Sequence, residues 1–565
     1  MRTKITALAA TALLAASLNV PSAATFPTDD KTIVSVLNRV GFGPRPGDVE
    51  RVRKIGLERY IDEQLHPSRI SDPEVERRLA GFTTINLSSK QIAEQFERPL
   101  LEARRDRKQE AASADVNAPR EKPDPAQMQV QQQANGVVVE LSQQKVLRAI
   151  YSDRQLQEVL TDFWFNHFNV DARKGRDRFL LTEYERETIR PHVLGSFREL
   201  LGATAKSPAM LFYLDNWLSA DPNGPHPTNG RQPGFARQGS GARPRARVFP
   251  PVPSGQPRPQ QANNRRNGLN ENYARELMEL HTLGVDGGYT QKDVTEVARA
   301  LTGWTIDNPR QGGEFHFEPR IHDQGEKTVL GHKIKAGGGE SDGEQVLDIL
   351  ASHPSTAKFI STKLARRFVS DTPPTALIDR MAARFTETKG NLTAVMTLLL
   401  TSPEFLSPDT YRAKVKTPFE FVVSAVRATG ADILDARPLV RSLQEMGMPL
   451  YQCQPPTGYK DAADAWTNTG ALVSRMNFAL ALTSGRMPSS ASGRGAALEA
   501  RARAFGMPGR GFVDTTSSSL ESWQTSVEAA LGRDLSETTR ATVAKATAPA
   551  QRVALVLGSP EFQRR

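Results

Sequence analysis

The sequence contains a single cysteine, Cys453, among 565 residues. One thiol cannot close an internal disulfide, so the fold has to rest on a hydrophobic core, which a chain of this length can build. Glutamine and proline residues flank Cys453, and no cysteine–histidine signature surrounds it. We therefore expect a structural loop cysteine rather than a nucleophile.

Several catalytic and nucleotide-binding motifs are missing. The chain has no phosphate-binding Walker loop, no His-Glu-x-x-His and no Cys-x-x-Cys pair. These absences count against dinucleotide enzymes, nucleotide hydrolases and common zinc proteases. We expect no nucleotide cofactor.

Apolar runs of membrane length are also missing. The run Ile5–Leu18 is shorter than the about 20 residues that a bilayer-spanning helix needs. It follows Arg2 and Lys4 and precedes Pro21 and a small-residue site ending at Ala24. This pattern predicts a signal peptide over 1–24 and a periplasmic or secreted protein with no transmembrane segment.

The formal net charge is +10, but the excess is concentrated in one stretch. Residues 221–268 carry eight arginines and one acid, and are rich in Pro, Gly, Gln and Asn. Such a composition buries too little apolar surface to order itself, so we expect a disordered insert. The insert can touch anionic envelope material, but a specific nucleic-acid site is not expected because the remaining body is close to neutral.

The rest of the chain shows the spacing of short amphipathic helices, for example over Asp48–Leu65, Gln155–His167 and Asn270–Leu283. The alternating segment Glu314–Glu318 predicts a strand, with Lys327–Leu330 as its candidate partner. We expect a mainly α, multi-helix globular body with a small β-hairpin element and two disordered inserts. The predicted regions are a signal peptide (1–24), an N-terminal helical region (25–103), a low-complexity insert in which a frayed helix end passes into a loop (104–136), a helical core (137–220), the arginine-rich insert (221–268), a helical core with the candidate site (269–482) and a C-terminal helical region (483–565).

The first candidate site is the polar helix Asn270–Gly284. Asn272, Glu276 and Glu279 fall at i, i+4 and i+7 and so share one face. Two carboxylates one turn apart can hold a metal or act as an acid–base pair, and His281 follows near the same helix end. The alternative is a surface face with an Arg275–Glu279 ion pair.

The second candidate is the loop region that contains His322 and Asp323, close to further histidines at 316 and 332. Imidazole and carboxylate ligands suit zinc, manganese or calcium. The alternative is a solvated loop.

The third candidate combines Phe163–Asn169, an aromatic run around His167, with the apolar segment Pro208–Asn216, which ends at Asp215. An aromatic run predicts burial in the hydrophobic core rather than a ligand site. Polar groups that are buried within such a run need hydrogen-bond partners. His167 and Asp215 are therefore either satisfied core groups or ligand-binding groups.

Several segments together resemble the bacterial family called "domain of unknown function 1800". The resemblance implies an exported protein, often encoded beside another family of unknown function that is similar to the alkaline-phosphatase superfamily. It implies no agreed activity and no catalytic residues. The segments that carry it are Leu37–Pro44, Phe163–Phe168, Pro208–Asn216, Asn270–Gly284, Tyr289–Trp304, His322–Asp323, Phe419–Gly430 and Trp466–Phe478.

Two functions follow as hypotheses. The first is a metal-assisted hydrolase of envelope or extracellular polymer, with Glu276 and Glu279 as catalytic residues and a divalent metal as cofactor. In this hypothesis His281, His322 and Asp323 bind the metal, while His167, Asn272 and Asp215 bind the substrate. The second is a non-catalytic envelope assembly or binding protein that works with an envelope protein partner, its polar clusters being buried hydrogen-bond networks.

Overall fold

The computed structural model describes Phe26 and residues 28–113, 124–224, 268–485, 512–513, 517–531 and 534–565. The predicted signal peptide over 1–24 lies outside the described residues, as does nearly all of the arginine-rich insert. Within the described ranges, none of the helices combines the length and the apolarity needed to cross a membrane.

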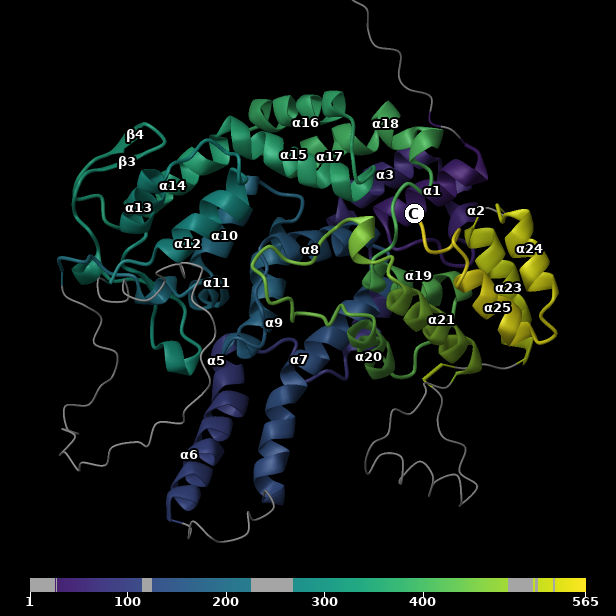
Figure 1. Cartoon of the computed structure of the whole chain (residues 1–565), viewed down its shortest axis with the longest axis horizontal. Coiled ribbons are helices and arrows are strands. Elements are labelled where there is room, and N and C mark those ends of the chain that lie inside the picture. The colour runs from purple at the N-terminus through teal and green to yellow at the C-terminus, as the bar shows by residue number, and fades with distance from the viewer. Residues whose placement is uncertain are drawn as a thin grey trace, which may run out of the picture.

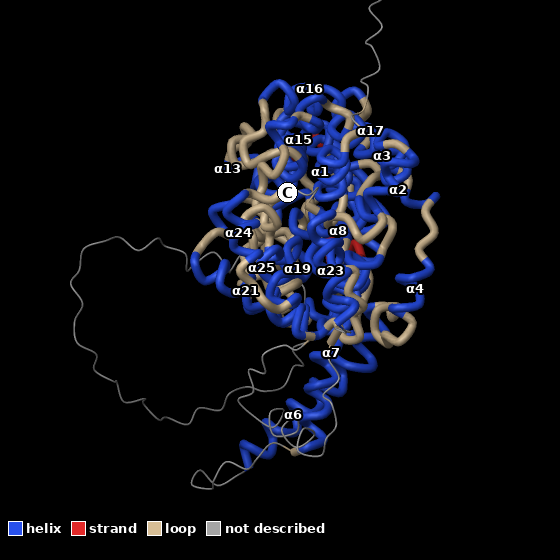
Figure 2. Tube along the Cα trace, turned by 90° about the vertical axis from the view of Figure 1, so that its right-hand side faces the viewer, coloured by secondary structure: helices blue, strands red, loops and turns tan. Residues whose placement is uncertain are grey.

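Helices make up most of the described chain (Figures 1 and 2), which confirms the mainly α fold. The helices up to the first buried aromatic run are α1 (Asp30–Val40), α2 (Asp48–Ile55), α3 (Leu57–Leu65), α4 (Pro73–Leu79), α5 (Ser89–Ile92), α6 (Arg98–Ser113), α7 (Pro125–Tyr151) and α8 (Gln155–His167). Those of the middle part are α9 (Leu181–Glu183), α10 (Phe197–Lys206), α11 (Pro208–Tyr213), α12 (Glu271–Glu276), α13 (Gln291–Ala300), α14 (Glu340–Ser352), α15 (Pro354–Phe368), α16 (Thr375–Glu387), α17 (Leu392–Leu400) and α18 (Pro403–Leu406). Those of the last part are α19 (Pro418–Thr429), α20 (Arg437–Glu445), α21 (Thr469–Ser484), α23 (Ser517–Ala530), α24 (Glu537–Ala544) and α25 (Pro549–Leu557).

Some segments wind more widely than an α-helix, with i→i+5 hydrogen bonds. They are the π-helical turns η2 (Ala93–Glu97), η4 (Tyr184–Ile189) and η8 (Leu277–Thr282). Such turns are rare and are frequently found at functional sites. η8 directly continues α12, the helix on which the first candidate site was predicted.

The helix predicted over Asp48–Leu65 is two helices, α2 and α3. Gly56 separates them with φ of 89°, a left-handed value that a helix interior does not tolerate, and its N–H bonds to the carbonyl of Val52. By contrast, α8 has the predicted bounds.

The strands form two small antiparallel sheets instead of the predicted single pair. β2 (Phe315–Phe317) pairs with β1 (Trp304–Ile306), and β3 (Lys327–Val329) pairs with β4 (His332–Ile334). The expected pairing of Glu314–Glu318 with Lys327–Leu330 is therefore wrong. The reason is local: Leu330 and Gly331 both have positive φ, 49° and 82°, which makes the two-residue hairpin turn that closes β3 onto β4.

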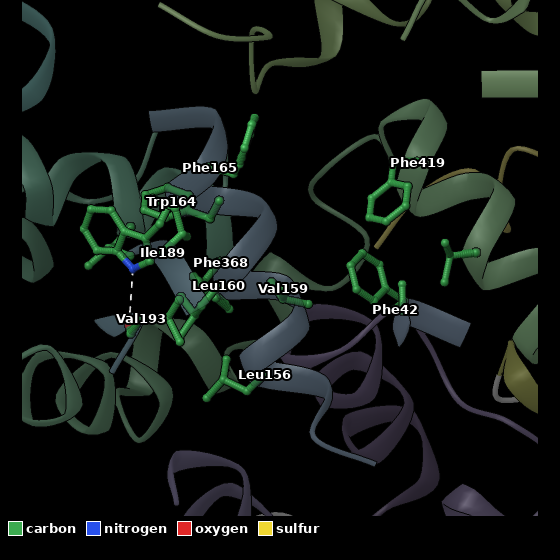
Figure 3. Close-up of a cluster of buried hydrophobic side chains, with 14 of the residues drawn as sticks. Phe42, Leu156, Val159, Leu160, Trp164, Phe165, Ile189, Val193, Phe368 and Phe419 are labelled. Carbon is green, nitrogen blue, oxygen red and sulfur yellow. Dashed lines mark hydrogen bonds between the residues drawn. The ribbon is translucent and has the colours of Figure 1, made fainter. Parts of the chain in front are cut away.

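The aromatic run of α8 lies in the core, as predicted. Trp164 is fully buried, and its indole N–H donates to the carbonyl of Val193 at 3.2 Å (Figure 3). Phe42 and Phe419, from distant parts of the chain, meet edge to face at 5.2 Å beside the same cluster (Figure 3). α8 therefore joins the N-terminal helices to the later ones.

The segment 104–136 differs from the predicted low-complexity insert. α6 continues to Ser113 and α7 begins at Pro125, so helix stands on both sides of residues 114–123, which lie outside the described residues. Ala, Gln, Glu, Lys and Arg favour helix, and Leu100 packs near Val137 in a small separate core at the base of the pair. The two helices project from the body side by side (Figures 1 and 2).

Candidate functional site

A polar hollow of about 650 Å³ opens where α12 meets the loop after α8. The end of α11 and the segment after Cys453 complete its wall. Convergent polar groups in such a depression are the ordinary setting of a ligand or active site. The lining residues are Asp171, Arg173, Lys174, Tyr213, Leu214, Asn272, Glu276, Gln454 and Pro456.

Hydrogen bonds hold the wall segments together. Asn169 donates through Nδ2 to the carbonyls of Cys453 and Pro455, both at 2.9 Å, and the Tyr213 hydroxyl donates to the carbonyl of Gln454 at 2.8 Å. Asn270 caps α12 and donates to the carbonyl of Leu214 at 2.7 Å. Asn169 is thus a satisfied buried group, and the hollow has a fixed frame.

Cys453 lies buried in this frame rather than in the hollow. Burial raises the pKa of its thiol to about 11, with Asp171 adding to the effect. The thiol therefore stays protonated near neutral pH, as expected of a structural cysteine.

Asn272 and Glu276 both line the hollow, in keeping with their predicted common face. Glu279 does not, because the chain changes from α to π winding at Leu277 and the wider turn carries the next residues round the axis. Glu279 instead accepts a hydrogen bond from the Tyr289 hydroxyl at 3.0 Å. The two predicted catalytic carboxylates thus face different surroundings.

Glu276 is the carboxylate best suited to transfer a proton. Partial burial and the neighbouring Glu279 raise its pKa, and Arg275 opposes this only in part. Within the described ranges it has no hydrogen-bond or ion-pair partner, and the Asn272 side chain beside it is exposed. A carboxyl with a raised pKa in a polar cavity is typical of a general acid or base.

The two cations of the hollow are already paired. Arg173 forks onto Asp171, with Nε to Oδ1 and Nη2 to Oδ2 both at 3.0 Å. Lys174 lies 2.9 Å from Asp215, which sits at the rim in a left-handed conformation at the start of a short turn. Asp215, predicted as a binding residue, therefore reaches the hollow only through Lys174.

Asp177 was not among the predicted site residues. It is fully buried, and within the described part of the chain neither carboxyl oxygen has a hydrogen-bond partner. Burial raises its pKa well above the ordinary value although Lys174 and Arg176 oppose this. Burial raises the pKa of Tyr213 as well, and the charges of Asp171 and Asp177 contribute. No sequence signal marked Asp177, because a charged loop after an aromatic helix is ordinarily solvated.

His167 and His281 come together in a second cluster. His167 Nε2 lies 3.1 Å from the carbonyl oxygen of His281, and its Nδ1 lies 2.8 Å from Lys363 Nζ. Burial lowers the pKa of both imidazoles, that of His281 to about 3, with Lys363 adding to the effect. Both are therefore neutral near pH 7.

Lys363 is a further residue that the sequence did not reveal. It lies off the apolar stripe of α15, where a charged side chain is ordinarily solvated, yet it is partly buried against His167, and Arg367 on the same helix is buried. Burial lowers the pKa of Lys363 to about 8, against the attraction of Asp461. The sequence does not reveal this burial, because the apolar stripe of a helix does not show which of its other faces a second layer of helices will cover.

His322 and Asp323 belong to a third group. His322 lies with Nδ1 2.7 Å from the carbonyl of Thr302 and with Nε2 3.2 Å from Asp342 Oδ2. Asp323 takes two hydrogen bonds from Arg299, at 2.8 and 3.0 Å. Burial alone would raise the pKa of Asp323, but Arg299 holds it below its usual value.

The predicted metal ligands do not form one site. His281 packs against His167, while His322 and Asp323 already have close protein partners. Among the described residues, no group of three or more His, Cys, Asp or Glu side chains is arranged to hold a metal ion. The residues therefore do not fit the divalent metal that the sequence suggested.

Fold and hollow together define a mainly helical protein with a framed polar site at an α-to-π junction. The chain belongs to the family described as protein of unknown function (DUF1800), whose model matches residues 35–564. The resemblance drawn from separate sequence segments is thus confirmed over nearly the whole chain. Neither the comparison with curated proteins nor that with solved structures gives a match.

Proposed function

We propose that the protein is an exported hydrolase of an envelope or extracellular polymer, and that Glu276 transfers the proton in the polar hollow. The observation that carries the proposal is a carboxyl of raised pKa and without an ion-pair partner among the described residues, which lines one open cavity together with two cations that are paired to other residues. Export rests on the N-terminal pattern over 1–24. No step is assigned to a metal, because the predicted ligands do not converge.

In this mechanism Glu276 takes a proton from a water molecule while the water oxygen bonds to the scissile carbon. The bond to the leaving group breaks, and the leaving group receives the proton from Glu276. Arg173 and Lys174, whose charges Asp171 and Asp215 partly offset, donate hydrogen bonds where negative charge develops, and Asn272 orients the substrate by its amide. An open hollow suits a polymer, because a chain can cross it from either side.

The test is hydrolysis of dye-labelled peptidoglycan, casein and β-glucan by the purified protein. If Glu276 acts as proposed, Glu276→Gln lowers the rate by about 100-fold or more, since proton transfer typically contributes that much. The acidic limb of the pH–rate profile is then the titration of Glu276. Glu445→Gln, which removes an exposed carboxyl paired with Arg441, is the matched control and leaves the rate unchanged. Full activity of the Glu276→Gln variant, or no hydrolysis of any of these polymers by the parent protein, would contradict the proposal.

A second function is favoured by a different observation. His167, His322 and Asp323 all have close protein partners, which is the pattern of polar networks that fix helix packing. This supports a non-catalytic envelope assembly or binding protein that works with a partner. In that case the basic insert 221–268 would serve as a contact arm.

If the basic insert is a contact arm, binding should weaken when it is removed. A tagged full chain should capture an envelope partner, or bind vesicles of anionic phospholipid, and a chain lacking residues 225–267 should do so at least about tenfold more weakly, because eight arginines are removed. Unfolding curves of the two chains should coincide, which controls for damage to the body. Equal binding by both chains would rule out the arm.

A further inference from the structure

The helical hairpin formed by α6 and α7 projects from the body (Figure 1). At its base Leu100, Ala134 and Val137 share a small core that is separate from the main one. Beyond that base, no described side chain of 101–109 or 124–133 is buried. Helices gain most of their stability from tertiary packing, so a pair this exposed presents a surface suited to a further packing element.

A groove of about 320 Å³ runs between these distal turns. Arg104 and Arg107 of α6 line it, together with amide side chains of α7 such as Gln131, and no acidic side chain lines it. Met128, also in the lining, is 46% exposed, and Leu101 on the facing helix is 47% exposed. The groove thus combines positive charge, hydrogen-bonding amides and exposed apolar surface.

The positive charge of the groove is not balanced by described neighbours. Arg104 donates to the neutral Gln131 Oε1 at 3.4 Å, and neither Arg104 nor Arg107 has an ion pair within the described ranges. Arg178 stands near the same base, and partial burial together with Arg104 lowers its pKa. An incoming carboxylate would relieve this repulsion.

We propose that the groove binds an acidic, amphipathic helix of a partner protein. A third helix laid between two antiparallel helices completes a bundle, with its carboxylates toward Arg104 and Arg107 and its apolar side over Met128. The two longest segments of the chain outside the described residues have the wrong sign: residues 225–267 contain eight arginines and no acid, and residues 486–511 contain five arginines and one acid. The surface is independent of the polar hollow, so it goes beyond the proposed hydrolase.

The test uses the full chain and a fluorescent synthetic helix that carries Glu on one face and Leu on the other. Charge reversal by Arg104→Glu with Arg107→Glu should weaken binding, measured by fluorescence anisotropy, at least about tenfold. The matched control is Arg105→Glu with Lys108→Glu. It makes the same charge change at the same spacing on the same helix, but outside the groove lining, and should change binding less than about threefold. A Lys-for-Glu version of the peptide should prefer the Arg104→Glu, Arg107→Glu variant.

Four outcomes would overturn the proposal. The first is failure of the parent protein to bind the acidic helix, and the second is an equal loss of binding in the two variants, which would mean unspecific attraction. Binding of the parent protein to phosphatidylglycerol vesicles, and not to the peptide, would show that the groove binds a membrane surface. A dimer in sedimentation that only the Arg104→Glu, Arg107→Glu variant loses would identify a second copy as the occupant. Circular dichroism of each variant checks that α6 still folds.

Discussion

Single buried charges in this protein depend on specific partners. Glu420 is buried in α19, where it accepts from the backbone N–H of Thr417 at 2.8 Å and pairs with Arg367, and Arg565 Nε lies 2.6 Å away. Burial alone would raise the pKa of Glu420, but Arg367 and Arg565 outweigh it and hold the pKa at about 2. The carboxylate is therefore an integral part of the interior.

Removing that charge should cost much stability. Glu420→Gln leaves two guanidinium groups without their counter-charge, so we expect a loss of about 3–5 kcal/mol in the free energy of unfolding, measured in urea. Glu404→Gln, which removes a carboxylate from a partly exposed pair with Arg380, is the control and should cost under about 1 kcal/mol. Similar losses for the two variants would contradict this account.

The same pair predicts a pH dependence. Because the folded pKa of Glu420 lies below its ordinary value of 4.5, its stabilisation is complete above pH 4.5 and is lost as the pH falls from 4.5 through about 2. The loss is on the order of 3 kcal/mol. The difference in unfolding free energy between parent and Glu420→Gln should therefore shrink between pH 5 and pH 3, and a constant difference would argue against it.

Helices in this protein are shaped by positions where a small residue is required. Gly343 of α14 is buried against Trp304, and a Cβ there would stand 2.3 Å from the Trp304 ring. Gly136 of α7 is the opposite case, because a Cβ there would meet no atom within 4 Å.

These two glycines should respond in opposite directions to the same change. Gly343→Ala forces the indole or the helix to move and should destabilise by about 1–3 kcal/mol. Gly136→Ala only removes chain entropy from the unfolded state and should stabilise by about 1 kcal/mol. Urea unfolding followed by circular dichroism measures both, and shifts of equal sign would show that the local environment does not decide the effect.

At the scale of the whole molecule, the sequence predicted local structure well and long-range contacts poorly. The bounds of α8 follow from neighbouring residues alone, and the structure has them. The contact of Lys363 with His167 joins residues 196 positions apart, and only the packing of α15 on the core creates it. Asp177 escaped prediction for the same reason, since its burial depends on elements far along the chain.

The candidate site was predictable where it depends on local spacing and not where it depends on long-range contacts. Asn272 and Glu276 share the hollow because they are one α-turn apart, which spacing reveals. Glu279 is not among the residues that line the hollow, and no simple sequence pattern indicates the π turn that contains it. The metal hypothesis needed the helix that carries His281 to meet the loop that carries His322 and Asp323, but the two loop residues bond to other protein groups.

The wide turn at Leu277–Thr282 has a consequence for how this helix can change in evolution. It accommodates one residue more than an ordinary turn, as the bond from the Leu283 N–H to the carbonyl of Met278 records. A one-codon deletion there would convert the wide turn into an ordinary one and keep the later side chains in nearly the same register, whereas a deletion in a regular α-helix rotates all later side chains by about 100°. The wide turn therefore keeps the residues after it in about the register that they would have in an ordinary helix with one residue fewer after Glu276.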